Sequence, residues 1–297
     1  MRAGARVFGG VACLAAALLA TAGEARAEEA GASFDEWITL DEDPVREPPW
    51  VKIQLGLVGW IESRSRIRGD RRGVVGTELE NLEQGQGLDD SGVGPSWRIS
   101  VGQALRVGFK GDQLTRGGSF QQQDEAVIFN GVVIAGPGGY VRTRFEFLSL
   151  GAYASWSPIA GADYRLTFLG GLQYFKLALK LTGTAELSNP RVFSDQAAGE
   201  LLSPIFGGQF ELRPFDALGV YTRIEFMNWS WATVGLKDAQ YFDFRLGGRV
   251  FFFDDLFAFG TEYRFLLLAA KTRSQGSSRL DGAVGLNGLS LFLEFRF

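Results

Sequence analysis

The last nine residues constrain the fold of this chain more than any other stretch. They read Leu-Ser-Leu-Phe-Leu-Glu-Phe-Arg-Phe from Leu289 to Phe297, and every odd-numbered position is apolar. The positions between them include Ser290, Glu294 and Arg296. Because side chains alternate between the two faces of a strand, this pattern predicts one apolar face and one charged face. An apolar stripe facing water would invite aggregation, so we expect lipid on that face and a polar barrel interior on the other.

This terminal segment resembles the closing strand of Gram-negative outer-membrane β-barrels. The resemblance is carried by five positions, namely Gly288, Leu291, Leu293, Phe295 and Phe297. In such barrels an alternating last strand that ends in Phe is read as a signal by the barrel-assembly machinery. The resemblance therefore implies that machinery as a partner and the bacterial outer membrane as the location.

A second resemblance points to a poorly characterised group of proteobacterial outer-membrane barrels. It rests on two short stretches, Gly76–Leu79 (Gly-Thr-Glu-Leu) and Gly87–Asp89 (Gly-Leu-Asp). It implies a fold and a location but no activity.

The first 27 residues have the pattern of a secretory signal peptide. Arg2 and Arg6 precede an uncharged run, Val7–Gly23, and Ala25–Ala27 forms a small-x-small cleavage site. A membrane-anchor helix, or a lipoprotein modified at Cys13, is the alternative. Cleavage after Ala27 would leave a mature chain without cysteine, so an exported protein of this kind must be held together without disulfides.

Residues 28–49 form a predicted periplasmic lead-in to the barrel. They contain eight acidic residues and one basic residue, with Pro44, Pro48 and Pro49 near the end. This composition favours an extended or disordered segment. A short helix over 33–40, which could plug the barrel, is the alternative.

The remainder, residues 50–297, predicts an all-β fold, a transmembrane antiparallel up-and-down barrel of about ten strands. The predicted strands are 50–62, 95–101, 105–114, 140–156, 163–182, 200–213, 217–230, 240–252, 256–270 and 282–297. The links between them alternate between long and short, as expected for outside loops and periplasmic turns. Two further segments, 74–82 and 126–134, would give twelve strands but break this alternation. The polarity of 163–182 changes phase near Tyr174 and Phe175, which predicts a β-bulge.

The chain contains no histidine, and this fact limits its chemistry most. General-base activation by imidazole and zinc sites built from Cys and His are excluded. The visible carboxylate pairs, Asp89-Asp90 and Asp254-Asp255, lie in predicted turns where solvated carboxylates are common. We therefore predict no enzymatic activity, no metal and no cofactor. The net charge of −4 argues against nucleic acid as a partner.

The predicted lumen is rich in charge. The non-lipid faces of the strands carry twelve basic residues: Arg98, Arg106, Lys110, Arg142, Arg144, Arg165, Arg213, Arg223, Arg245, Arg249, Arg264 and Arg296. They also carry seven acidic residues: Asp112, Glu146, Glu211, Glu225, Asp243, Glu262 and Glu294. Buried charges must be paired, so we expect a network across strands. The excess of basic residues suggests a narrow, anion-leaning channel or small-solute transporter. A closed, salt-bridged lumen in a structural or surface-interaction barrel is the alternative.

A basic stretch follows the first predicted strand, in a predicted outside loop. It comprises Arg64, Arg66, Arg68, Arg71 and Arg72. Arginine pairs with phosphate in a bidentate manner, so this loop is a candidate contact for lipopolysaccharide. A solvated loop, or arginines that line the mouth and face Glu78 and Glu80, is the alternative.

Overall fold

The computed structural model describes most of the predicted barrel region. The described residues are 49–71, 88–89, 91–121, 126–129, 132–161, 163–184, 192–229, 236–272 and 278–297. The barrel belongs to one compact unit, Glu47–Phe297. Within the described ranges, no helix is long and apolar enough to cross a membrane. The predicted signal peptide and nearly all of the acidic lead-in lie outside these ranges and stay predictions.

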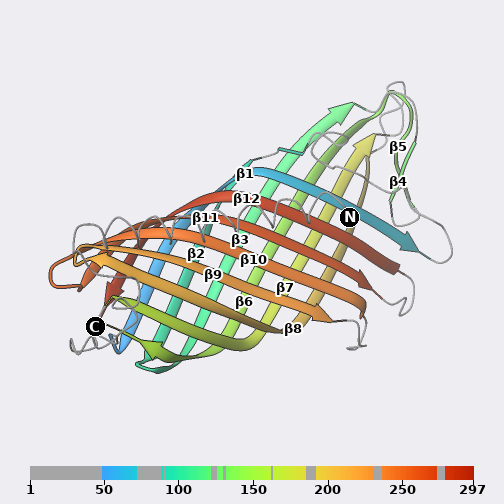
Figure 1. The fold of residues 1–297 in the computed structure, drawn as a ribbon. Coiled ribbons are helices and arrows are strands. Elements are labelled where there is room, and N and C mark those ends of the chain that lie inside the picture. The colour runs from blue at the N-terminus through green and yellow to red at the C-terminus, as the bar shows by residue number, and fades with distance from the viewer. Residues whose placement is uncertain are drawn as a thin grey trace, which may run out of the picture. The chain divides into compact units, whose positions relative to one another are not determined.

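Ten antiparallel strands close into one barrel (Figure 1). In their order around the barrel they are β1 (Val51–Arg71), β2 (Gly92–Gly102), β3 (Leu105–Gln121), β6 (Tyr140–Ala160), β7 (Tyr164–Thr184), β8 (Val192–Phe215), β9 (Leu218–Trp229), β10 (Leu236–Phe252), β11 (Phe257–Thr272) and β12 (Ser278–Arg296). Neighbours around the barrel follow one another along the chain, apart from the β1–β12 seam and the β4–β5 hairpin between β3 and β6. The predicted all-β, up-and-down barrel of ten strands is confirmed.

The barrel is closed by pairing between its first and last strands. The register runs from Lys52 opposite Arg296 to Arg71 opposite Ser278, with one shift between Trp60 and Glu62. At the end of this seam, the Val51 N–H donates to the Phe297 carbonyl at 2.8 Å and the Phe297 N–H donates to the Val51 carbonyl at 2.9 Å. The ten barrel strands therefore leave no unpaired edge.

The two ends of the barrel differ in their connections. We call the end that holds Val51 and Phe297 the terminus end. There the links are tight: Gln103 and Ala104 join β2 to β3, and Asp216 and Ala217 join β8 to β9. The opposite end, which carries a separate small hairpin, we call the hairpin end (Figure 1). The predicted short links thus all lie at one end.

The separate hairpin lies between β3 and β6. It consists of β4 (Val127–Phe129) and β5 (Val132–Ala135), which pair with each other and not with the barrel strands. Phe129 and Ile134 are fully buried and share one apolar cluster with residues of the barrel wall. The described part of 126–134 therefore adds no barrel strand, as the ten-strand interpretation expects. Its buried side chains pack on the apolar cluster of the interior. The other candidate strand, 74–82, lies outside the described residues.

The strands extend further toward the hairpin end than the sequence predicts. β1 continues to Arg71 and β3 continues to Gln121, where loops are predicted from residues 63 and 115. Alternation continues in these extensions, where Ser63 and Ser65 of β1 and Arg116 of β3 are buried on the inner face and Arg64 and Thr115 are exposed. The predicted strands end too early because the prediction relies on apolar residues at outward positions, and the outward residues of these extensions are polar.

Along strand β7, the outer face changes from apolar to polar side chains, and the inner face changes from polar to apolar side chains. On its outer face, Leu172 is 52% exposed, and Lys180 is exposed closer to the hairpin end. On its inner face, Gln173 is buried near mid-strand, and Phe175 and Leu179 are buried beyond it. This arrangement indicates lipid around the half near the terminus end and water around the half near the hairpin end.

The predicted bulge near Tyr174 and Phe175 is wrong. The pairing of β7 with both β6 and β8 runs through these two residues without a shift. The phase of the sequence changes because the environment outside the barrel changes, while the strand keeps the same face turned inward.

We predict that this exchange of polarity can be measured by cysteine labelling. Cys13 is the only cysteine and lies in the predicted signal peptide, so single-cysteine variants of the mature chain are unambiguous. In a lipid bilayer, a water-soluble maleimide should label Lys180→Cys readily. Leu172→Cys should be protected until the bilayer is dissolved by detergent. Equal labelling of both variants in the bilayer would contradict the assignment.

Candidate functional site in the barrel interior

Eight charged side chains from four strands meet inside the barrel. We call them the mid-barrel ion cluster. Its members are Lys110 and Asp112 of β3, Arg223 and Glu225 of β9, Asp243 and Arg245 of β10, and Glu262 and Arg264 of β11. None is more than 6% exposed. Each strand contributes residues two apart, because alternate residues share one face. With four bases and four acids, the cluster is balanced in charge.

Arg264 lies at the centre of this cluster and is fully buried. Its Nη1 and Nη2 donate to the Asp112 carboxylate at 2.7 and 2.9 Å. Its Nε and Nη2 donate to the Asp243 carboxylate at 3.0 and 2.8 Å. One guanidinium thus binds two carboxylates, which suits its planar set of five donors.

The other members complete the network around Arg264. The guanidinium of Arg245 lies 2.9 Å from Asp243 and 3.2 Å from Glu262. Lys110 and Arg223 both pair with Glu225, and the Arg223 Nε donates to it at 2.7 Å. Since every charge has an opposite partner, an ion could pass this level only by breaking buried pairs.

The register explains why these pairs are formed within strands and diagonally. Across β9 and β10, Asp243 lies opposite Glu225 and Arg245 lies opposite Arg223. Like charges therefore face each other directly. Attraction is satisfied by the next inward residue of the same strand, diagonally between β10 and β11, or by a more distant strand.

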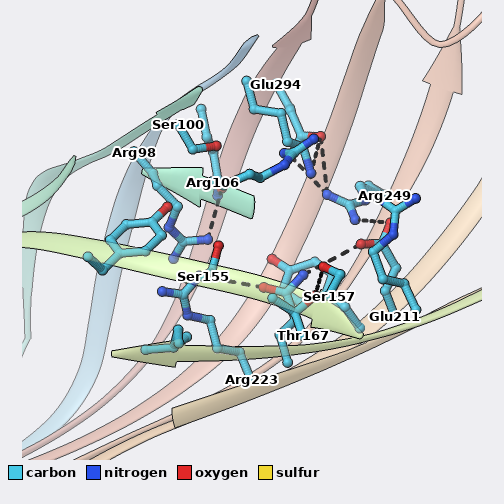
Figure 2. A pocket seen from close by; sticks show the side chains of 17 residues that line it. Arg98, Ser100, Arg106, Ser155, Ser157, Thr167, Glu211, Arg223, Arg249 and Glu294 are labelled. Carbon is cyan, nitrogen blue, oxygen red and sulfur yellow. Dashed lines mark hydrogen bonds and ion pairs between the residues drawn. The ribbon is translucent and has the colours of Figure 1, made fainter. Parts of the chain in front are cut away.

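A cavity with a different charge balance lies between this cluster and the terminus end (Figure 2). It spans about 720 Å³ between side chains, part of it open to solvent. We call it the basic cavity. Its charged lining consists of Lys52, Arg98, Arg106, Arg165, Glu211, Arg223, Arg249 and Glu294. Basic residues thus outnumber acids here.

An apolar core fills the interior toward the hairpin end. It includes side chains of the barrel wall and of the β4–β5 hairpin in one cluster. Its largest fully buried members are Leu88, Leu114, Phe129, Ile134, Phe145, Phe147, Phe175 and Leu179. The interior therefore changes from charged to apolar along the barrel axis.

The structure corrects part of the predicted lumen. Arg142, Arg144 and Glu146 lie on the outer face of β6, and the side chains of Arg144 and Glu146 are 62% and 47% exposed. Val141 and Phe145 occupy the inner face instead. This part of β6 is surrounded by water, so its polar side chains point outward.

The other predicted lumen residues lie on inner faces. Arg98, Arg106, Glu211 and Arg249 line the basic cavity, and Lys110, Arg223, Glu225, Asp243, Arg245, Glu262 and Arg264 belong to the mid-barrel ion cluster. Arg213 and Arg296 lie near the terminus end, where both pair with Asp255. Asp255 is therefore an ion-pair partner, while Asp89 is exposed and Asp90 lies outside the described part of the chain.

The basic stretch after residue 62 is part of β1 and not a loop. Arg64 points outward with its side chain 81% exposed, and it lies 3.1 Å from Glu62. The backbone of Arg66, Arg68 and Arg71 continues β1, and Arg72 lies outside the described residues.

The residues of the predicted assembly signal lie on both faces of β12. Leu291 and Leu293 are 56% and 40% exposed, and Phe297 is 61% exposed just after the strand. Phe295 shares their outer face. Gly288 is buried on the inner face, where a Cβ would lie 2.6 Å from the Gly59 carbonyl oxygen.

Sequence analysis missed two basic residues on the inner face, Lys52 of β1, which lines the basic cavity, and Arg116 of β3. Arg116 is 3% exposed, and its guanidinium donates to the Ser63 and Ser65 hydroxyls and to the Asp89 carbonyl. The inward alternation of Lys110, Asp112, Leu114 and Arg116 could have revealed it. The predicted strand stopped at 114, before this residue.

The outer surface decides what kind of barrel this is. Large apolar side chains are exposed on every barrel strand: examples are Leu57, Ile99, Phe109, Trp156, Phe168, Phe206, Phe226, Phe252, Phe259 and Leu291. A closed antiparallel sheet with an apolar outside and charged residues inside satisfies all backbone groups in lipid. The described strands form a β-barrel with the architecture of outer-membrane barrels.

Comparison with known proteins adds solved barrels of similar topology. No protein-family model matches the chain, and no curated protein sequence matches it. The barrel is similar to the outer membrane protease OmpT from Escherichia coli, with 9% identity, a TM-score of 0.46 and coverage of 86% of this chain and 99% of OmpT.

Two further solved barrels are similar at lower TM-scores. The translocator domain of the autotransporter NalP from Neisseria meningitidis has 12% identity and a TM-score of 0.38, covering 94% of this chain and 98% of that domain. OprG from Pseudomonas aeruginosa has 10% identity and a TM-score of 0.33, covering 84% and 98%.

We predict that removing the central guanidinium strongly destabilises the barrel. Arg264→Met leaves Asp112 and Asp243 without their shared partner, and breaking a buried ion pair in this way costs about 3–5 kcal/mol. Unfolding by urea in lipid vesicles should show this loss. Arg144→Met, which removes an exposed ion pair, is the matched control and should cost less than about 1 kcal/mol. Similar losses for both variants would contradict a central role for Arg264.

Proposed function

We propose that this protein is an outer-membrane barrel with a closed lumen that serves a structural or surface-interaction role. The observation that carries the proposal is the filling of the interior at two successive levels. The mid-barrel ion cluster occupies the first level, and the apolar core under the β4–β5 hairpin occupies the second.

Side chains fill the barrel interior at the levels where an open channel would hold water. Arg223 and Arg245 of the mid-barrel ion cluster are only 4% and 3% exposed. Beyond them the interior is apolar, with Phe145 and Phe175 at most 1% exposed. Moving an ion through such a region carries a large desolvation cost. These features support an anchor over a permanently open pore.

The orientation follows from the rule that outer-membrane barrels have short periplasmic turns. The terminus end would then face the periplasm, and the hairpin end would lie at the cell surface. The water-facing half of the wall and the β4–β5 hairpin would project from the membrane. This projecting half is the surface through which we expect the protein to interact.

A narrow, anion-leaning channel is the second candidate function. It is favoured by the basic cavity, whose lining contains more basic than acidic residues. To conduct, the barrel would have to open both the mid-barrel ion cluster and the hairpin cover.

We predict that the purified protein produces no conductance steps in planar bilayers at neutral pH. The physical reason is the absence of a hydrated path through the described interior. A general porin, purified and inserted in the same way, serves as the positive control. Reproducible steps with anion preference that Arg98→Gln reduces would overturn the closed-lumen proposal and favour the channel.

We also propose that the outer face of β1 contacts lipopolysaccharide. Arg64 is highly exposed on that face, close to the end of the barrel that we assign to the cell surface. Arginine binds phosphate groups in a bidentate manner, and lipopolysaccharide is rich in phosphate. Arg66 and Arg68 continue the same alternate positions along the strand.

A triple variant tests this contact. Arg64→Ser, Arg66→Ser and Arg68→Ser together should lower the amount of lipopolysaccharide that co-purifies with the folded barrel. The comparison variant changes Arg142 and Arg144 of β6 to Ser. Unchanged co-purification with the β1 variant, or an equal loss with both variants, would refute a specific β1 contact.

A non-enzymatic role is part of the same proposal. The sequence has no histidine, so no imidazole is available as a general base. Among the described residues, no group of three Cys, Asp or Glu side chains is arranged to hold a metal ion.

A further inference from the structure

The basic cavity carries more positive charge than its own carboxylates neutralise. Arg223 is held by Glu225 of the mid-barrel ion cluster. The remaining lining has five basic residues, Lys52, Arg98, Arg106, Arg165 and Arg249, and two acidic residues, Glu211 and Glu294. Basic residues therefore outnumber carboxylates in this part of the lining by five to two.

Both carboxylates are concentrated on one side of the cavity. Glu294 lies 2.8 Å from Arg249 and 3.3 Å from Lys52, and Glu211 also pairs with Arg249. Figure 2 shows Arg249 and Glu211 together, across the cavity from Arg98 and Arg106. Arg98 of β2 and Arg106 of β3 therefore lie apart from the carboxylates that pair with Arg249.

Arg98 and Arg106 bind only neutral acceptors among the described residues. The Arg98 Nη1 donates to the Gln54 side-chain oxygen at 3.3 Å. Arg106 donates to the backbone carbonyls of Gln103 and Pro49, at 3.1 and 2.6 Å. The Nε atom of Arg98 is buried and has no hydrogen-bond acceptor. The Nε atom of Arg249, a residue that is 4% exposed, also has no acceptor. A buried donor without an acceptor is costly, so these groups favour an anionic partner.

The cavity also provides neutral donors and a closed inner wall. The hydroxyls of Ser100, Ser155 and Thr167 line it. Arg223 belongs to both the cavity lining and the mid-barrel ion cluster, so the cluster closes the cavity on the side of the hairpin end. A ligand would enter from the terminus end.

From these observations we propose that the basic cavity is a binding site for a small oxyanion, with Arg98 and Arg106 as its main cationic ligands. Phosphate, sulfate and small carboxylates share the required chemistry, namely several acceptor oxygens around a compact negative charge. The proposal is independent of whether the barrel conducts, because a site closed at its inner end can bind without transport.

Binding can be tested with inorganic phosphate as the probe and the mature full-length barrel in detergent. Isothermal titration calorimetry should show saturable binding, and phosphate should raise the unfolding temperature, because a ligand that binds the folded state stabilises it. Sulfate should compete. Sodium chloride at the same ionic strength should give neither effect.

Two variants locate the site. Arg98→Gln should weaken phosphate binding about tenfold or more, since a hydrogen bond to a charged group is worth about 1.5–3 kcal/mol. Arg144→Gln, on the outer face of β6, is the matched control and should bind as the parent does. The different gel migration of unheated and heated barrel checks that each variant is folded.

Three results would overturn the proposal. They are no saturable binding by the parent barrel, equal affinity in the parent and Arg98→Gln, and an equal loss in Arg144→Gln.

Discussion

The structure depends on the closure of the sheet by hydrogen bonds between β1 and β12. In lipid, an unpaired backbone group costs several kcal/mol, so a membrane-spanning sheet must have no edge. The seam joins Val51 to Phe297 at one end and reaches Arg71 and Ser278 at the other. Once the sheet is closed, every strand has one inner and one outer face, and each side chain is assigned to one of them.

In the closed barrel, inward side chains are stabilised in two different ways along the axis. Near the middle, eight charged residues neutralise one another around Arg264, because a buried charge without a partner is strongly destabilising. Near the hairpin end the outer face meets water, and the apolar side chains turn inward as in a soluble protein. The basic cavity differs from both, because Arg98 and Arg106 have no carboxylate partner among the described residues.

Much of this fold could be predicted from alternation and link length. The stretch Leu289–Phe297 predicts its outer face correctly, and the alternating links predict ten strands. The inner faces of Asp243 and Arg245 also follow directly from their neighbours Phe242 and Phe244. The prediction is wrong for Arg142, Arg144 and Glu146, and for the bulge near Tyr174, because it assumes lipid along the full length of each strand. Arg116 is missed for a related reason, since its strand continues beyond the last apolar outward position.

The sequence by itself determined the strand periodicity, the approximate positions of the tight turns and the absence of imidazole chemistry, and it favoured ten strands over twelve. These properties depend on nearest neighbours along the chain and on residue type alone. Only the tertiary structure decided which charges meet. Arg264 and Asp112 are distant in sequence, and their contact depends on the register and closure of ten strands. The tertiary structure also decided where water replaces lipid outside the barrel wall. Alternation of polar and apolar residues is compatible with either surrounding, and only the structure shows which set of residues points outward.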